Sequence, residues 1–301
     1  MARGKKGRPI HGWLIVDKPA GRSSAAMVAS AKRAFDARKA GHAGTLDPPA
    51  TGLLAIAFGE ATKTVPYVTE AQKCYAFTLR WGVATTTDDA EGEPIARCDL
   101  RPDRAAICAA LPAFTGDINQ IPPQISAVKL AGVRAYERVR AGETVALGAR
   151  PLHVAELTLT DQPDDDHASF RLVCGKGGYV RSIARDLAAV LGTLGHVTAL
   201  RRLWSGPFDL TASTPGDMLE NAGGALGVDR LLAVSAGLCD LVELPCTPEG
   251  AARLRNGNPV AVAASAIGYG QTAWASYAGE PVAVGIYRAG MLHPTRVFRF
   301  D

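Results

Sequence analysis

The chain has 301 residues, of which 47% are hydrophobic and 21% are charged, and its formal net charge is +4 at pH 7. These values are ordinary for a soluble globular protein with one large domain or two average ones. No apolar run approaches the roughly 20 residues that a membrane-spanning helix needs, so the sequence indicates no membrane segment. The mildly basic balance permits a nucleic-acid partner without requiring one.

The N-terminal residues and the cysteines are informative about the cellular compartment. The first ten residues include Arg3, Lys5, Lys6 and Arg8, but no apolar core of a signal peptide follows them. We therefore expect a basic, disordered tail at residues 1–9. The 6 cysteines show neither a C-x-x-C pair nor a paired histidine spacing, which argues against a zinc site. Their low density indicates reduced thiols in a cytoplasmic protein.

The first predicted elements are a short strand at residues 11–16 and a helix after it. Either Ser23 or Ser24 is a suitable N-cap for the helix, because a serine hydroxyl accepts a hydrogen bond from a free amide of the first turn. The apolar face of this helix, at helical spacing, comprises Val28, Ala31 and Phe35. The apolar run at 53–58 predicts a buried strand.

Residues 74–81 alternate between apolar and more polar side chains, which is typical of a strand with one buried face. The apolar set comprises Tyr75, Phe77, Leu79 and Trp81. The polar stretch 83–94 predicts a turn region. A helix is expected at 104–114.

Residues 124–150 are rich in basic side chains and are predicted to form an excursion from the main body of the chain. Five basic residues stand against two acidic ones, a local net charge of +3: Lys129, Arg134, Arg138, Arg140 and Arg150 against Glu137 and Glu143. A solvated amphipathic helix carries such charges without any binding role. The charge pattern alone therefore leaves the role of this segment open.

A hairpin is expected next, with strands at 152–160 and 170–174 joined by an acidic turn at 161–167. Glycines 175, 177 and 178 then form a flexible turn into a helix. Ser182 is its expected N-cap and Gly192 its expected end. The buried stripe of this helix is predicted to be Ile183, Leu187 and Leu191.

The composition of the chain changes around residues 238–248, where a proline-containing linker leads into short apolar runs. These runs lie at 259–263, 273–277, 281–287 and 295–300. They predict a small β-barrel at the C-terminus. Five arginines against four acids give residues 241–301 a net charge of +1, so charge adds little to this assignment.

The run GHAGTLDPPATGLL, from Gly41 to Leu54, is the most informative stretch of the chain. Its single acid, Asp47, precedes two prolines that disfavour helical geometry and stiffen the backbone. Its glycines permit left-handed or closely approaching backbone. A turn between two elements has a similar composition, so the residues alone leave open whether Asp47 is structural or catalytic.

This run resembles the catalytic loop of the pseudouridine synthases, and specifically of the TruB family of bacterial tRNA pseudouridine-55 synthases. Four further runs match the same family in chain order. They are WLIVDKPAG from Trp13, the pair Cys74-Tyr75, GYVRSIARDL from Gly178, and VTALRR from Val197. The resemblance covers roughly residues 10–210 and is highly specific.

The resemblance implies an α+β fold. It implies a catalytic domain at 10–238 with the pseudouridine synthase fold, built on a central mixed, mainly antiparallel sheet. A small PUA-like RNA-binding β-barrel is implied at 239–301, and an RNA-gripping role for the excursion at about 124–150. The Lys18-Pro19 motif is expected to brace the loop beneath Asp47.

The implied activity is conversion of uridine to pseudouridine at position 55 in the T loop of tRNA. The N1–C1′ bond breaks, the uracil turns over, and C5 is joined to C1′. This isomerisation needs no redox step and no phosphate energy, which agrees with the absence of a G-x-G-x-x-G or Walker motif. Neither a metal nor an organic cofactor is implied.

The resemblance also implies roles for the catalytic residues. Asp47 is the nucleophile or ion-pair stabiliser, by addition to C6, attack on C1′ or removal of the C2′ proton. Arg181 is its expected partner and keeps the carboxylate ionised; a cation at a helix N-terminus opposes the macrodipole and so indicates a role beyond the helix. Tyr75 stacks on the uracil, and its hydroxyl takes the C5 proton. On the strand pattern alone, Tyr75 is equally a core residue.

Three residues are implied to bind the substrate. His42 enters the space left in the RNA stack when the target base is extracted. Tyr179 lines the pocket against the base and the sugar, and Leu200 forms an apolar wall for the base. The expected partner is the T stem-loop of tRNA, recognised by a monomer without an obligatory protein partner.

Two other classes of function are compatible with parts of this sequence. A non-catalytic tRNA-binding or tRNA-folding protein on the same fold would not need Asp47, Tyr75 and Arg181, which are all present. A carboxylate-dependent hydrolase would need a second acid within roughly 5–10 Å of Asp47. Asp17 is the only such acid in the matched runs near Asp47, and its neighbours indicate a structural strand end.

Overall fold

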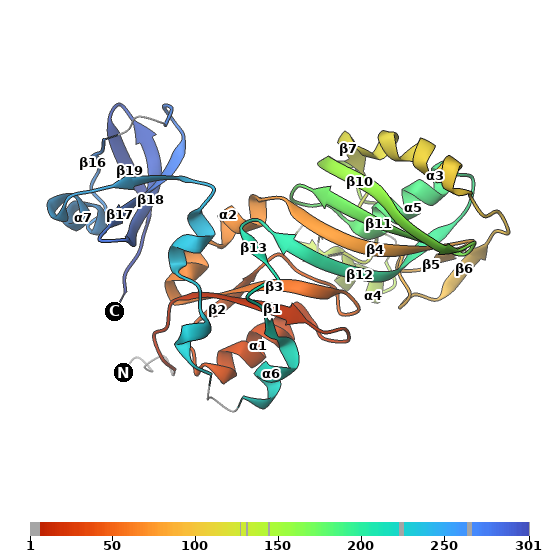
Figure 1. Cartoon of the computed structure of the whole chain (residues 1–301), viewed down its shortest axis with the longest axis horizontal. Coiled ribbons are helices and arrows are strands. Elements are labelled where there is room, and N and C mark those ends of the chain that lie inside the picture. The colour runs from red at the N-terminus through yellow and green to blue at the C-terminus, as the bar shows by residue number, and fades with distance from the viewer. Residues whose placement is uncertain are drawn as a thin grey trace. The chain divides into compact units, whose positions relative to one another are not determined.

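The computed structural model describes residues 7–126, 128–130, 132–143, 145–222, 226–263 and 267–300. The chain forms two compact units, which Figure 1 shows as a ribbon. The first unit comprises Met1–Pro48, Gly52–Glu70 and Ser205–Asp301, and the second comprises Pro49–Thr51 and Ala71–Trp204. Each unit combines helices with sheet, so the predicted α+β class is confirmed. In the described part of the chain, no helix has the length and apolar character needed to cross a membrane.

The first unit begins with a small sheet covered by helices. Its elements before the C-terminal sheet are β1 (Gly12–Lys18), α1 (Ser24–Ala34), β2 (Ala40–Ala43), β3 (Thr51–Phe58), α2 (Val65–Glu70), β13 (Phe208–Asp209), β14 (Thr214–Pro215) and α6 (Gly216–Asn221). Strand β3 pairs antiparallel with both β1 and β2, and β14 pairs parallel with β1. The sheet is therefore mixed and mainly antiparallel, as predicted.

Alternation along β1 and β3 gives this sheet an apolar core on each face. One core contains Leu14, Leu54 and Ile56, and α1 packs on it through Met27 and Ala31. Figure 1 shows α1 and α6 beside β1. The other core is formed by residues of the opposite parity, among them Trp13, Ile15, Leu53 and Ala55. Burial on both faces explains why β3 is a continuous apolar run.

Helix α1 begins where the serine pair predicted. The hydroxyl of Ser23 accepts a hydrogen bond of 3.1 Å from the backbone N–H of Ala26, so Ser23 is the N-cap. Of the expected apolar face, Ala31 and Phe35 are fully buried and Val28 is half-buried.

The C-terminal part of the first unit is a curled sheet with one helix. Its elements are β15 (Val242–Pro245), α7 (Pro248–Arg255), β16 (Val260–Ala261), β17 (Thr272–Tyr277), β18 (Glu280–Arg288) and β19 (Met291–Val297). The strand order is β15-β17-β18-β19-β16, consistent with the expected PUA-like barrel. The last strand ends at Val297 and begins earlier than the predicted run 295–300. Helix α7, capped by Thr247 and started by Pro248, was not predicted.

This C-terminal sheet is anchored to the rest of the first unit. The ammonium group of Lys63 donates a hydrogen bond of 2.7 Å to the carbonyl oxygen of Val297. The backbone N–H of Arg299 donates one of 2.7 Å to the carboxylate of Glu60. Phe298 is buried in the same apolar core as Trp13.

The second unit is built on a run of paired strands. Its elements are β4 (Lys73–Trp81), β5 (Val83–Thr85), β6 (Pro94–Arg97), α3 (Arg104–Ala110), β7 (Gly116–Gln120), β8 (Lys129–Leu130), β9 (Val133–Arg134), α4 (Ala135–Arg140), β10 (Arg150–Asp164), β11 (His167–Cys174), α5 (Val180–Val190) and β12 (Gly195–Ser205). The strand order is β12-β4-β11-β10-β7. The predicted alternation in β4 is confirmed, since Tyr75, Phe77, Leu79 and Trp81 are all buried. The predicted hairpin is also confirmed as β10 and β11, which pair antiparallel.

Three predicted boundaries in this unit were wrong. The expected turn 83–94 contains strand β5, which pairs with β6. The helix expected at 104–114 ends at Ala110 and continues as a 3₁₀ turn, Leu111–Phe114, because Pro112 cannot donate the next helical hydrogen bond. The acidic turn of the hairpin is only two residues long, because β10 extends to Asp164 and β11 begins at His167.

Ser182 was also wrong as an N-cap, because α5 begins at Val180 with Tyr179 as the N-cap. The Ser182 hydroxyl instead donates a hydrogen bond of 2.8 Å to the carbonyl oxygen of Ile121. The helix ends as predicted before Gly192, whose φ of 73° is the left-handed value that glycine adopts at low cost. Ile183 and Leu187 are buried, as expected.

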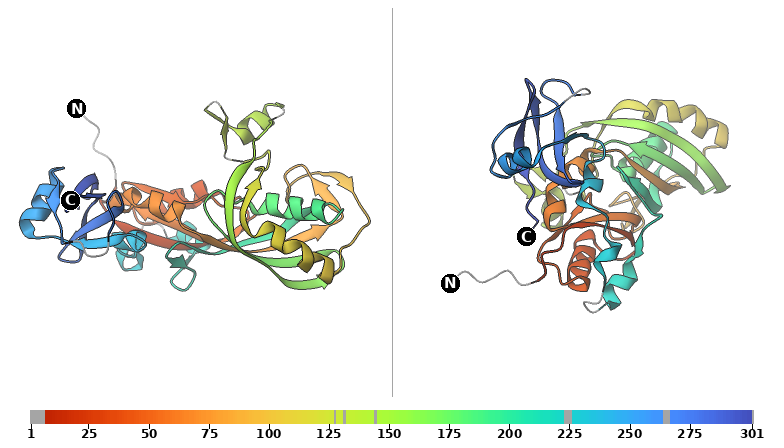
Figure 2. Two further views of the ribbon diagram at one scale, coloured as in Figure 1. Left: turned by 90° about the horizontal axis from the view of Figure 1, so that it is seen from above. Right: turned by 60° about the vertical axis from the view of Figure 1, so that its left-hand side comes forward.

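The expected excursion leaves the sheet between β7 and β10. It contains the strand pair β8–β9 and helix α4, and Figure 2 shows α4 projecting away from the sheet of its own unit. The side chains of Lys129, Arg134 and Arg140 lie outside the described part of the chain. Residues 1–6 of the expected tail lie outside it as well. Arg8, in contrast, is held by its backbone, which bridges to Ala37.

Candidate functional site

The loop that carries Asp47 is fixed by a buried serine of helix α1. The chain leaves β2 through Gly44, which has a φ of 86°, and re-enters the sheet at β3. The Ser24 hydroxyl accepts a hydrogen bond of 2.8 Å from the N–H of Leu46 and donates one of 2.9 Å to its carbonyl oxygen. One side chain thus binds both the N–H and the carbonyl oxygen of Leu46, the residue before Asp47. Asp47 itself is half-buried.

A second anchor lies on the other side of Asp47. Lys18, at the end of β1, is fully buried, and its ammonium group donates to the carbonyl oxygens of Pro19, Arg22 and Pro48 at 2.9, 2.7 and 3.0 Å. The N–H of Gly21 also donates to the Pro48 oxygen, at 2.9 Å. Burying an ammonium group is costly without such partners. The expected bracing role of Lys18 is therefore confirmed.

His42 belongs to the same unit as Asp47. It lies on β2, opposite Ile56 of β3, and is half-buried. Four residues of chain, Gly44 among them, separate it from Asp47. The first unit thus presents His42 on a strand and Asp47 on the braced loop that follows that strand.

Tyr75 lies in the second unit on β4, opposite Leu172 of β11. Its side chain is 8% exposed, so it is largely buried but not sealed from solvent. Phe77, on the same face, stacks on Phe170 with ring centroids 5.2 Å apart. The strand that holds Tyr75 is therefore fixed by aromatic packing within its sheet, and helix α5 packs against it.

Arg181 is in the first turn of α5 and is only 6% exposed. Its guanidinium donates hydrogen bonds of 2.9 Å to the carbonyl oxygen of Thr87 and 3.1 Å to that of Ile125. The carboxylate of Asp89 lies 3.6 Å from the same group. These contacts fix the position of a buried cation. This contact of Asp89 with Arg181 was not predicted from the sequence, which places Asp89 in the expected polar turn at 83–94.

A neighbouring ion pair supports this arrangement. Arg185, one turn further along α5, lies 3.2 Å from the carboxylate of Asp88 and also donates to the carbonyl oxygen of Ile121 at 2.9 Å. Burial raises the pKa of the Asp88 carboxyl above its ordinary value, while the Arg185 guanidinium acts in the opposite direction. Asp88 and Asp89, in the turn between β5 and β6, thus each contact an arginine of α5.

Tyr179 is positioned by a side chain from a distant strand. Gln120, the last residue of β7, accepts a hydrogen bond of 2.9 Å from the N–H of Tyr179 and donates one of 3.0 Å to its carbonyl oxygen. Gln120 is buried. This reciprocal pair sets where α5 begins, and so it places Tyr179 and Arg181 together at the helix start.

Leu200 lies on β12 at the edge of a groove of about 400 Å³ in the second unit. Pro49, Thr51 and Arg201 line the same groove. The Thr51 hydroxyl donates a hydrogen bond of 3.3 Å to the carbonyl oxygen of Leu200. Pro49 and Thr51 follow Asp47 closely in the chain, so the segment after the catalytic candidate forms part of the wall beside Leu200.

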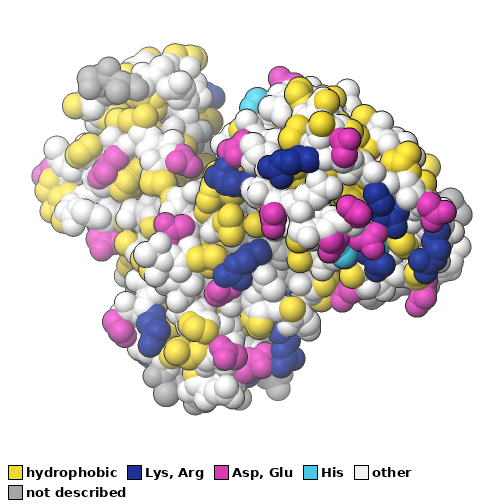
Figure 3. Space-filling model, turned by 45° about the vertical axis from the view of Figure 1, so that its right-hand side comes forward, with side chains coloured by type: hydrophobic (Ala, Val, Ile, Leu, Met, Phe, Trp, Pro, Cys, Tyr) yellow, Lys and Arg dark blue, Asp and Glu magenta, His cyan; other side chains and the backbone are white. Residues whose placement is uncertain are grey.

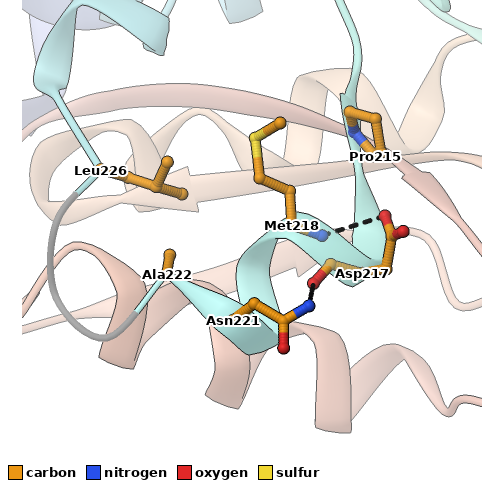
Figure 4. Close-up of a pocket in the computed structure, with 6 residues that line it drawn as sticks. All are labelled: Pro215, Asp217, Met218, Asn221, Ala222 and Leu226. Atoms are coloured by element: carbon orange, nitrogen blue, oxygen red, sulfur yellow. Dashed lines mark hydrogen bonds between the residues drawn. The ribbon is translucent and has the colours of Figure 1, made fainter.

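A larger hollow of about 470 Å³ in the first unit contains none of the predicted residues. Figure 4 shows its lining of Pro215, Asp217, Met218, Asn221, Ala222 and Leu226. The Asp217 carboxylate accepts a hydrogen bond from its neighbour's N–H at 3.0 Å, and Asn221 donates to the Asp217 carbonyl oxygen at 3.1 Å. Since its polar groups are engaged in the local backbone of α6, this hollow is not a candidate for catalysis.

The predicted residues therefore fall into two groups. Asp47 and His42 belong to the first unit, and Tyr75, Tyr179, Arg181 and Leu200 belong to the second. Among the described residues, no three His, Cys, Asp or Glu side chains gather as metal ligands do. On the face drawn in Figure 3, basic and acidic side chains are interspersed. A polyanion would therefore meet local groups of cations there and not one broad basic surface.

Family models match most of the chain between its ends. Residues 32–180 match the model described as TruB family pseudouridylate synthase (N terminal domain). Residues 181–224 match the model described as tRNA pseudouridylate synthase B C-terminal domain. The first match contains the Asp47 loop and Tyr75, and the second begins at Arg181.

Curated relatives match over the whole length. The tRNA pseudouridine synthase B of Dinoroseobacter shibae is 61% identical, with 99% of each chain covered. That of Cereibacter sphaeroides is 58% identical, again with 99% of each chain covered. A solved H/ACA RNP bound to a substrate RNA containing 2′-deoxyuridine has a similar fold, with a TM-score of 0.74, 21% identity, and coverage of 99% of this chain and 92% of that one.

Proposed function

This chain belongs to the TruB family of pseudouridine synthases, and from that premise we propose that it converts uridine 55 in the T loop of tRNA to pseudouridine. A relative that is 61% identical over 99% of both chains carries the name tRNA pseudouridine synthase B, which supports the reaction and the class of substrate. The observation that carries the proposal is the Asp47 loop. A buried lysine and a buried serine hold the backbone on both sides of one carboxylate.

Asp47 is the catalytic residue of the proposed reaction. A carboxylate held in a fixed loop adds to the target nucleotide or stabilises the charge that forms when the N1–C1′ bond breaks. The route remains one of the three that the family resemblance allows. No redox change accompanies the isomerisation, so the reaction as proposed uses no cofactor.

Arg181 and Tyr75 complete the proposed catalytic group. A guanidinium fixed by two backbone carbonyls and Asp89 is suited to stabilise the carboxylate of Asp47 without moving. Tyr75 stacks on the uracil, and its hydroxyl accepts the C5 proton in the last step. Its slight exposure on an otherwise buried strand face supports a position at the edge of a pocket.

Three further residues are assigned to substrate binding. His42 fills the space left in the RNA when the uridine is extracted. Tyr179 contacts the base and sugar, and its backbone is fixed by Gln120. Leu200 supplies an apolar wall, supported by its place in the groove that Pro49 and Thr51 also line.

The proposed division of labour along the chain follows the predicted domains. Residues 1–9 form a basic tail, 10–238 the catalytic domain with its RNA-gripping excursion at 124–150, and 239–301 a PUA-like RNA-binding domain. The protein acts on tRNA as a monomer in the cytoplasm, without an obligatory protein partner. Six free cysteines agree with a reducing compartment.

Tritium release from tRNA that contains 5-tritiated uridine, followed by mapping of the modified position, tests the proposal. The wild-type chain releases tritium from position 55 of unmodified tRNA. Asp47→Asn binds the same tRNA with near wild-type affinity but releases no tritium. Asp36→Asn is the matched control, since Asp36 is an exposed acid of the same unit outside the loop, and it stays active. Substantial turnover by Asp47→Asn would remove Asp47 from its catalytic role.

A further inference from the structure

Arg185 of helix α5 contacts the same two segments of the second unit that hold Arg181. Its guanidinium donates a hydrogen bond of 3.2 Å to the carboxylate of Asp88 and one of 2.9 Å to the carbonyl oxygen of Ile121. Arg181 lies four residues earlier, on the same face of the helix, and also donates to both segments. Each arginine thus joins α5 to the turn between β5 and β6 and to the segment that follows β7.

Asp88 stands between the two groups of the turn that contact Arg181. The carbonyl group of Thr87 belongs to the peptide bond before Asp88, and the carboxylate of Asp89 follows on the other side. Asp88 has a φ of 59°, a left-handed value that residues other than glycine seldom adopt. The backbone rotation at Asp88 therefore sets how the Thr87 carbonyl and the Asp89 side chain are directed toward Arg181.

Asp88 is held by both its backbone and its side chain. Its carbonyl oxygen accepts a hydrogen bond of 3.1 Å from the N–H of Val197 on β12, and its carboxylate contacts Arg185. The Asp88 side chain is only 19% exposed, so water screens this ion pair only in part. A carboxylate withdrawn from water turns toward solvent when its cation is removed. Loss of Arg185 would therefore release the turn that carries the partners of Arg181.

The second segment is held in a similar way. The carbonyl oxygen of Ile121 accepts hydrogen bonds from Arg185 at 2.9 Å and from the Ser182 hydroxyl at 2.8 Å. Four residues further along the chain, the carbonyl oxygen of Ile125 accepts a hydrogen bond from Arg181 at 3.1 Å. Arg185 therefore fixes the start of the segment whose end holds Arg181.

We infer that Arg185 is a positioning residue for Arg181, because it fixes the turn and the segment whose groups orient the Arg181 guanidinium. The inference rests on the proposed function, in which Arg181 stabilises the carboxylate of Asp47. A misplacement of about 1 Å can cost about 100-fold in rate. The loss falls on the chemical step and not on RNA affinity, because Arg185 acts through the protein groups that hold Arg181.

Single-turnover tritium release from unmodified tRNA that contains 5-tritiated uridine tests the inference, with RNA affinity measured for each variant. Arg185→Gln lowers the single-turnover rate about 10- to 100-fold and changes RNA affinity less than about 3-fold.

Arg101→Gln is the matched control. Arg101 belongs to the same unit, and its side chain is 29% exposed, close to the 31% of Arg185. It likewise contacts one carboxylate, that of Asp166, and donates to the carbonyl oxygen of Cys98 at 2.8 Å. Arg101→Gln keeps the wild-type rate within about 2-fold. Equal rates for the two variants overturn the inference.

A second background separates the positioning of Arg181 from an independent effect of Arg185. In Arg181→Lys the guanidinium that Arg185 positions is absent, so adding Arg185→Gln lowers the remaining rate by less than about 3-fold. The same loss in both backgrounds would mean that Arg185 acts independently, against the inference. Arg185→Lys serves the same comparison if Arg185→Gln does not fold. A single ammonium group cannot reproduce the fork that contacts both partners, and we expect a loss of about 5-fold.

The N–H of Val197 reports on the turn without any need for activity, because it donates to the carbonyl oxygen of Asp88. Its hydrogen exchange is faster in Arg185→Gln than in Arg101→Gln, and equal exchange contradicts the inference. If the wild type releases no tritium from its target position, the proposed function fails. If the wild type is active and Arg185→Gln matches Arg101→Gln, the inference alone fails.

Discussion

The ammonium group of Lys18 donates a hydrogen bond of 3.0 Å to the carbonyl oxygen of Pro48, 30 residues further along the chain. This contact joins the end of β1 to the loop of the catalytic candidate. Pro48 directly follows Asp47, so the same bond restricts the carboxylate. The structural and catalytic effects of Lys18 can therefore be measured together.

Replacing Lys18 by Met keeps a long apolar stem but removes every donor. Because the carbonyl oxygens of Pro19, Arg22 and Pro48 then lose a buried partner, we expect the free energy of unfolding to fall by about 3 kcal/mol. Urea denaturation measures this loss. The exposed Lys32→Met is the control and changes stability by less than about 0.5 kcal/mol. Equal stability of the two variants would show that the hydrogen bonds of Lys18 do not stabilise the folded protein.

Gln120 holds Tyr179 through one donated and one accepted hydrogen bond, so two substitutions divide its role. Gln120→Glu keeps the acceptor for the Tyr179 N–H and loses the donor, while Gln120→Leu loses both. We expect kcat for tritium release to fall in both variants, more in Gln120→Leu, with a smaller change in KM. A role confined to stability would lower the unfolding midpoint and leave kcat of the folded enzyme unchanged.

The excursion offers a matched pair of substitutions. Arg138 and Glu143 form an ion pair with a distance of 3.2 Å, so Arg138→Gln and Glu143→Gln disrupt the same internal contact. Only the first removes a cation from a segment proposed to grip RNA. We expect Arg138→Gln to weaken tRNA binding and to reduce the slope of log K against log salt by about 0.7–0.9. Glu143→Gln should not reduce the slope, and identical slopes for both variants would return the segment to an ordinary solvated helix.

Asp88 predicts a pH dependence of stability. Burial raises the pKa of its carboxyl in the folded protein, so the folded state keeps a proton that the unfolded chain releases from about pH 4 upward. The unfolded state then binds fewer protons, and the free energy of unfolding falls as the pH rises towards the folded pKa. Asp88→Asn does not titrate, so its stability relative to wild type rises across this window. Urea denaturation from pH 4 to 7 measures it, and a relative stability that falls instead would mean that Arg185 dominates.

Local patterns predicted much of the fold. The alternation of β4, the Ser23 cap of α1 and the Gly192 end of α5 all depend on residues close together in sequence, and each was confirmed. The paired apolar cores on β1 and β3 follow from the same period-two logic. These features are set by backbone geometry and burial, which short sequence windows record well.

The start of α5 could not be predicted in this way. Ser182 has the side chain of an N-cap, but Gln120, 59 residues earlier, satisfies the backbone of Tyr179 and fixes the helix start there. Asp89 was missed for the same reason, since its arginine partner lies 92 positions away and a polar turn gives no local sign of it. A partner that is distant in sequence leaves no periodicity to read.

The apolar core shared by the C-terminal sheet and the rest of the first unit limits how this chain can be shortened. Phe298, Trp274 and Val284 fill the same apolar core as Trp13 and Leu53. A fragment that stopped at residue 238 would leave indole and leucine surfaces of β1 and β3 facing water. Fragments that lack the C-terminal residues 239–301 are therefore expected to aggregate. The contribution of these residues is better tested by surface substitutions than by deletion.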